Sequence, residues 1–65
     1  MKLLNLDETA AMTRVPAATL RYYRHAGTGP QSFKLGRRVM YREEDVQAWM
    51  QAAYEADHRD PEPAA

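Results

Sequence analysis

The sequence predicts a small α+β domain that is mostly helical, with two short helices, a β-hairpin and a third helix. Three observations lead to this class. A chain of 65 residues has room for one domain. Pro16 and the Gly27–Pro30 stretch bound two short helical segments, and two short alternating runs then flank Gly36. The helical spacing of Val46 and Trp49 follows, so a helix closes the domain.

The first helix is predicted over about Leu6–Thr13. Asn5 is a good N-cap, and Glu8, three residues later, completes a capping box. Pro16 suits the first turn of the next helix, where its missing N–H costs nothing. The inward face of the first helix is expected to hold Leu6, Ala10 and Thr13.

The second helix is predicted over about Ala17–Ala26, and its two faces differ in chemistry. Leu20 and Tyr23 form an apolar stripe. A helix that packs with one face and offers Arg and Tyr on the other is typical of helices that enter a DNA groove. A plain helical hairpin is the alternative, but few large apolar residues are available for one. The opposite stripe holds Ala18, Arg21, Tyr22 and His25.

A β-hairpin is predicted after Gly27, which suits a left-handed C-cap. Its strands are Gln31–Leu35 and Val39–Tyr41, joined by a tight turn at Gly36–Arg38. Arginines at a hairpin tip suit phosphate contacts or insertion into a minor groove. The alternative is a solubilising loop. An isolated hairpin is marginal in water, so some of its apolar side chains must pack on the helices: Phe33, Leu35, Val39 or Tyr41.

The third helix is predicted to begin near Arg42, with Glu43, Glu44 and Asp45 in its first turn, where negative charge is favoured. With this acidic end, the helix should face away from DNA. The domain is therefore predicted over residues 1–54 and a disordered tail with two prolines over residues 55–65. Trp49 is expected to be the largest core contributor, within an apolar stripe of Val46, Trp49, Met50 and Ala53.

The net charge of zero hides a segregation of charge. No acidic residue lies between Glu8 and Glu43. A charge run is often only a solvated face, but an acid-free middle of this length favours contact with nucleic acid. The seven cations of this segment are Arg14, Arg21, Arg24, Lys34, Arg37, Arg38 and Arg42.

Other function classes find little support. The chain has no cysteine, so neither disulfides nor thiolate metal sites are expected. Its two histidines are His25 and His58, and no nucleophile, base or phosphate-binding Gly loop accompanies them, so no enzyme, metal or cofactor is expected. No apolar run of about 18 residues occurs, so no membrane span is expected. Residues 1–5 lack the long apolar region of a signal peptide, so none is expected. We expect a cytoplasmic, nucleoid-associated protein without membrane contact.

Two sets of residues resemble known families. The segments Leu6–Ala10 and Thr19–Tyr23, with Val15 between them, resemble the N-terminal winged helix of MerR-type regulators. The segments Gly29–Arg38 and Tyr41–Trp49 are similar to small excisionase and AlpA-like proteins. Together the resemblance covers about residues 3–51. It implies a winged helix-turn-helix fold and binding to double-stranded DNA.

The sequence departs from these families in three ways. Arg14 stands where a Gly is frequent, which costs about 1 kcal/mol if the site is left-handed. Pro16 replaces the usual polar cap. The long dimerisation helix and effector-binding region of MerR regulators are missing, so we expect no small-molecule effector and favour the excisionase-like group.

The resemblance then implies an excisionase, or recombination directionality factor, that bends DNA at repeated sites. Its partners would be double-stranded DNA, further copies of itself and an integrase. The alternatives are a compact MerR-like transcriptional regulator of a phage or mobile element, and an interaction module without DNA binding. The predicted DNA-binding residues are Ala17, Ala18, Thr19, Arg21, Tyr22, Arg24, His25, Lys34, Arg37 and Arg38.

Overall fold

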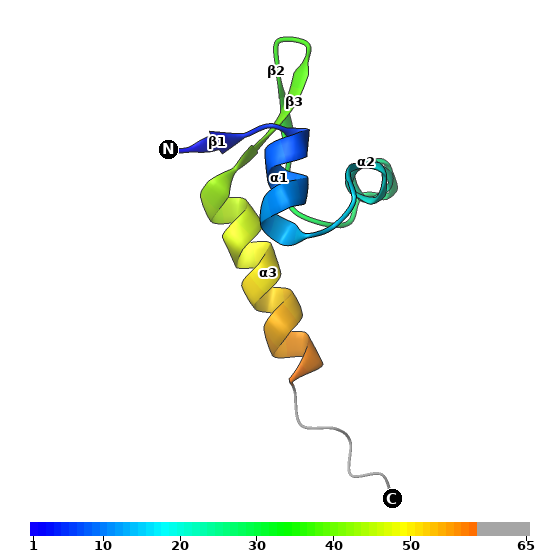
Figure 1. Cartoon of the computed structure of the whole chain (residues 1–65), viewed down its shortest axis with the longest axis vertical. Coiled ribbons are helices and arrows are strands. Elements are labelled where there is room, and N and C mark those ends of the chain that lie inside the picture. The colour runs from blue at the N-terminus through cyan, green and yellow to red at the C-terminus, as the bar shows by residue number, and fades with distance from the viewer. Residues whose placement is uncertain (59–65) are drawn as a thin grey trace, which may run out of the picture.

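The computed structural model describes residues 1–58, which form three helices and a three-stranded antiparallel sheet (Figure 1). The sheet order is β1-β3-β2, so β3 is the central strand. The predicted α+β class and the winged helix-turn-helix arrangement are confirmed. In chain order the elements are β1 (Leu3–Leu4), α1 (Leu6–Thr13), α2 (Ala17–Ala26), β2 (Phe33–Leu35), β3 (Arg38–Arg42) and α3 (Glu43–Asp57).

Helices α1 and α2 begin and end at the predicted residues. The capping box of α1 is formed, because the Glu8 backbone N–H donates to Asn5 Oδ1 at 2.7 Å and the Asn5 N–H donates to Glu8 Oε1 at 2.8 Å. Arg14 ends α1 in the left-handed conformation, with φ 62° and ψ 20°. The expected backbone strain of a non-glycine residue in the left-handed conformation is therefore present at Arg14. Gly27 ends α2 at φ 79°, as predicted.

The hairpin has a tighter loop than predicted. Leu35 pairs with Arg38, so Gly36 and Arg37 alone form the connection and Arg38 belongs to β3. Gly36 has φ 66°, and Arg14 is the one non-glycine residue of positive φ among residues 1–58. A left-handed first residue followed by an ordinary second residue is the pattern of a type II′ turn, which suits the twist of a hairpin.

Strand β1 was not predicted, since two residues have no periodicity to detect. It pairs with β3 through Leu3–Arg42 and Leu4–Tyr41. Just before it, the Lys2 carbonyl accepts the Glu43 N–H at 2.9 Å. The N-terminal residues therefore cover one edge of β3 and satisfy a free donor at the start of α3.

The core is small and centres on Leu4, Tyr41 and Val46. Tyr41 is the largest fully buried side chain, at 1% exposure, whereas Trp49 is only half-buried, so the prediction for Trp49 is wrong. The Trp49 ring instead packs on Tyr23 of α2, with ring centroids 6.2 Å apart. The partly buried side chains around the core are Leu6, Met12, Val39 and Met50.

The inward face of α1 centres on Thr9, which is fully buried, while Leu6, Ala10 and Thr13 are half-buried. Thr9 is a polar residue that is satisfied locally, because its hydroxyl donates to the Asn5 carbonyl at 2.8 Å.

Helix α3 is longer than predicted. It runs to Asp57, so residues 55–57 of the predicted tail are helical, and residues 59–65 lie outside the described part of the chain. Ala53 is exposed, and so is every residue from 51 to 58, because this end of α3 projects beyond the other elements (Figure 1). Within residues 1–58 no helix is long and apolar enough to cross a membrane.

Candidate nucleic-acid interface

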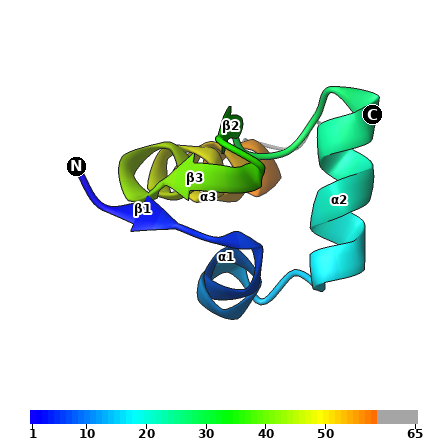
Figure 2. The same ribbon diagram turned by 90° about the horizontal axis from the view of Figure 1, so that it is seen from above.

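Helix α2 lies at one edge of the molecule in both views (Figures 1 and 2). Leu20 anchors it at 1% exposure, and the half-buried Tyr23 adds the contact with Trp49. This is the packing face that the Leu20 and Tyr23 stripe predicted. The opposite stripe of Ala18, Arg21, Tyr22 and His25 is exposed as expected.

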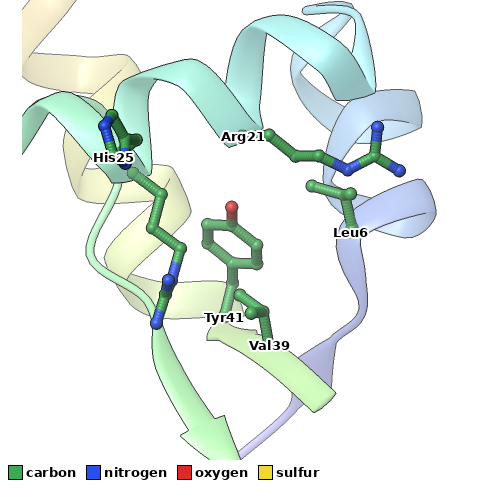
Figure 3. A pocket seen from close by; sticks show the side chains of 6 residues that line it. Leu6, Arg21, His25, Val39 and Tyr41 are labelled. Atoms are coloured by element: carbon green, nitrogen blue, oxygen red, sulfur yellow. The ribbon is translucent and has the colours of Figure 1, made fainter. Parts of the chain in front are cut away.

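A hollow of about 350 Å³ lies between α2, β3 and the start of α1 (Figure 3). Leu6, Val39 and the ring of Tyr41 give it apolar walls. The side of the hollow that belongs to α2 carries nitrogen groups from Arg21, Arg24 and His25. An apolar floor with a cationic rim is suited to an anion that carries some apolar surface.

A second hollow of about 330 Å³ adjoins the first and shares Leu6, Arg21 and Val39 with it. Its other lining residues are Asn5, Asp7 and Arg38. We call the two hollows together the α2–β3 groove. Because Arg21 of α2 and Arg38 of β3 line the same hollow, the helix and the hairpin present positive charge on one face of the molecule.

Apart from Arg42 at the end of β3, the cations of α2 and the hairpin have no ion-pair partner in the part of the chain that the structure describes. Arg24 is held differently, since its Nε donates to Ser32 Oγ at 3.0 Å. The ion pairs that are present lie at the start of α3, where Arg42 binds Asp45 at 2.8 Å and Lys2 lies 3.7 Å from Glu43. Unpaired cations remain available to an external anion. They are Arg21, Arg24, Lys34, Arg37 and Arg38.

Two pKa values in this region depart from their ordinary range. Burial raises the pKa of the Tyr41 hydroxyl, and the positive charge of Arg24 opposes this shift. The hydrogen bond from Arg42 to Asp45, followed by the charge of Asp45, raises the pKa of Arg42. Tyr41 is therefore a neutral hydrogen-bond donor at pH 7, and the Arg42 side chain, at the end of β3, is held by Asp45 in the first turn of α3.

The predicted site residues fall into three groups. Ala18, Arg21, Tyr22, Arg24 and His25 are exposed on α2, and Tyr22 is 66% exposed. Ala17 and Thr19 are half-buried and less accessible than predicted, because they lie on the side of α2 that faces the domain. On the hairpin, Arg38 lines the groove, while Lys34 and Arg37 are exposed beyond it.

The sequence did not identify Tyr41 as part of this surface. The sequence indicates only that some of four hairpin side chains, Tyr41 among them, must pack on the helices. The ring does pack there, at 1% exposure of the residue, but that expectation gives no information about the hydroxyl. Its neighbours across the groove come from α1 and α2, so only the folded chain brings them together. In the described residues no group of three or more acidic or His side chains could hold a metal ion.

Comparison with protein families agrees with this geometry. Residues 3–54 match the model of the helix-turn-helix domain, in an excisionase-like DNA-binding family that is typically non-enzymatic. No curated protein and no solved structure matches the chain significantly. The match covers β1 through most of α3, and so includes both helices of the motif and the hairpin. The chain therefore belongs to the helix-turn-helix domain family and binds double-stranded DNA.

Proposed function

We propose that the protein places α2 in a major groove of DNA and the β2–β3 hairpin on the adjacent backbone. The observation that carries this proposal is the α2–β3 groove, where Arg21 and Arg38 converge from different elements. Helix α2 has 10 residues. A helix of that size is about 15 Å long, which is enough to present two turns to a major groove about 12 Å wide.

The exposed residues have distinct roles in this arrangement. Arg21 contacts a base edge or a close phosphate, and Tyr22 donates to a phosphate. Ala17 and Ala18 touch thymine methyl groups from the start of the helix, beside Thr19. If about five phosphates are neutralised, the log–log salt slope of the affinity is about −4.5. The remaining contacts to phosphates come from Arg24, His25, Lys34, Arg37 and Arg38.

We further propose that the protein is an excisionase, which bends attachment-site DNA so that an integrase excises an element. One module of this size makes a small interface and binds modestly, which favours several copies on repeated sites. The edge strand β2 supports self-association, because Phe33 and Leu35 are 37% and 55% exposed beside its unpaired backbone edge. This function places the protein with the nucleoid DNA.

The DNA-binding mode is tested with duplexes selected by the protein from a random pool. Arg21→Ala should lower affinity for the selected duplex about 10- to 100-fold and weaken the preference for it over a scrambled duplex. Arg42→Ala is the matched control, since Arg42 is paired with Asp45. A sequence preference that survives Arg21→Ala unchanged contradicts the role of Arg21, and no salt-dependent binding of any duplex contradicts the whole mode.

A compact transcriptional regulator is the second candidate, favoured by the MerR-like Thr19–Tyr23 segment of α2. The two functions use the same contacts and differ in outcome. Excision of a marked element by an integrase, with and without the protein, is measured beside a promoter reporter that carries the selected site. An excisionase raises recombination and a regulator changes reporter output alone.

A further inference from the structure

The hydroxyl of Tyr41 is the accessible end of a side chain that is otherwise buried. The Tyr41 side chain is 1% exposed. Among the described residues its hydroxyl makes no hydrogen bond. Figure 3 shows this hydroxyl pointing away from β3 toward α2, with Arg21 and His25 on either side of its direction. It therefore faces the 350 Å³ hollow of the groove.

An accessible hydroxyl at the end of a buried ring is free to bind a partner. No buried side-chain nitrogen or oxygen of the described residues lacks a hydrogen bond, so the unpartnered Tyr41 hydroxyl is accessible from the hollow. Phenylalanine would fill the same core volume but would offer no donor there. The hydroxyl is therefore available to a partner that is not part of this chain.

The surroundings of the hydroxyl select an anionic partner. Arg21, Arg24 and His25 line the hollow, and no carboxylate does; Asp7 lines only the adjoining hollow near Arg38. The Nε of Arg24 binds Ser32 Oγ at 3.0 Å, which orients its guanidinium and leaves its terminal nitrogens available. A tyrosine hydroxyl that opens into a hollow lined by two arginines supplies a donor set for phosphate oxygens.

We propose that the hollow is a seat for one phosphate of the DNA backbone, which accepts a hydrogen bond from the Tyr41 hydroxyl between Arg21 and Arg24. This inference rests on the DNA-binding mode proposed above. The apolar walls of Leu6 and Val39 contact the adjoining sugar and keep water away from the phosphate, which strengthens the charge-assisted bonds. The seat lies where α2 meets β3, so it fixes the position of the helix relative to the hairpin on the duplex.

The proposal is tested with Tyr41→Phe and with Tyr54→Phe as the matched control, since Tyr54 is 60% exposed on α3. The probe is the selected duplex with single phosphates replaced, one at a time, by neutral methylphosphonate. Tyr41→Phe should weaken binding to the unmodified duplex about tenfold, as expected for a hydrogen bond to a charged group. Thermal unfolding shows whether each variant is folded, and Tyr41→Phe should be about as stable as the wild type, since the Tyr41 hydroxyl makes no hydrogen bond to the described residues.

At one backbone position, the effects of Tyr41→Phe in the protein and of methylphosphonate in the DNA should not be additive. Methylphosphonate at that position should weaken binding of the wild type and of Tyr54→Phe about tenfold. It should weaken binding of Tyr41→Phe much less, because that variant has already lost the hydrogen bond. A folded Tyr41→Phe variant that binds as the wild type does, or a loss that is additive at every phosphate, overturns the phosphate seat and leaves the DNA-binding mode intact. Absence of DNA binding by the wild type overturns the DNA-binding mode itself.

Discussion

Arg21 and Arg42 show how differently one residue type is used in two regions of this molecule. Both belong to the acid-free segment of the sequence. Arg42 donates from Nε and Nη2 to the two carboxylate oxygens of Asp45, both at 2.8 Å, and lies 3.9 Å from Glu44. Arg21 lies in the groove without an ion-pair partner in residues 1–58. The positions of the acidic residues, more than the number of cations, thus separate the interface from the scaffold.

The same two regions differ in packing. The scaffold of β1, β3, α1 and α3 encloses Leu4, Tyr41 and Val46. Helix α2 contributes one fully buried side chain, Leu20. A helix held by few buried groups keeps most of its surface for a partner, and its attachment depends strongly on that one residue.

The largest effect is expected from Leu20→Ala, which tests this dependence. Removing a fully buried Leu side chain should lower the free energy of unfolding by about 3 kcal/mol, a large part of the stability of so small a domain. Chemical denaturation measures the change. Leu35→Ala is the matched control, since Leu35 is 55% exposed and should cost much less. Equal losses for the two variants would mean that α2 is not anchored as described.

Neutralising one exposed cation tests whether the unpaired cations of the interface, and not the paired Arg42, contact DNA phosphates. Arg37→Gln should make the log–log salt slope of DNA affinity shallower by about 0.9, because one fewer phosphate is neutralised. Arg42→Gln should leave the slope unchanged, because its charge is already paired with Asp45. Fluorescence anisotropy over a salt series gives both slopes. A larger slope change for Arg42 than for Arg37 would reverse the assignment of the two regions.

Tyr41 belongs both to the core of the scaffold, through its ring, and to the α2–β3 groove, through its hydroxyl. The titration of this hydroxyl tests how burial of the side chain affects the stability of the scaffold. Burial raises its pKa above the ordinary value of 10.0. The folded state then holds the proton more tightly than the unfolded state does, so this contribution to stability is constant below about pH 10 and is lost as the pH rises through the folded pKa. From about pH 9 to about pH 11, the free energy of unfolding should therefore decrease less for Tyr41→Phe than for the wild type.

Most of the fold could be predicted because local signals specify it. The capping box at Asn5 and Glu8, the left-handed Gly27 and the spacing of Leu20 and Tyr23 all act within a few residues. Strand β1 could not be predicted, since its two residues become a strand only by pairing with β3 from the far end of the domain. The burial of Tyr41 has the same origin, because β1, α1 and α3 close over β3. Trp49 lies farther along α3, where its ring packs on Tyr23 of α2.

The features of the interface that depend on one element could also be predicted, and those that depend on several elements could not. Which side chains of α2 are exposed follows from helical spacing, so Arg21, Tyr22 and His25 could be predicted. The groove could not, because Leu6, Arg21 and Val39 converge from three elements. The commitment of Arg42 to Asp45 depends on a turn at the start of α3 that charge counting does not reveal.

The smallest effect concerns Arg14, whose left-handed backbone joins α1 to α2. Arg14→Gly relieves this strain but gives the unfolded chain more freedom, so a net gain of about 0.5 kcal/mol in the free energy of unfolding is expected. Arg14→Ala keeps the strain and should give no gain. Arg14 does not line the α2–β3 groove, so DNA affinity should be unchanged in both variants. If both variants lose affinity, Arg14 belongs with the cations of the interface, and the boundary between the two regions moves to the turn before α2.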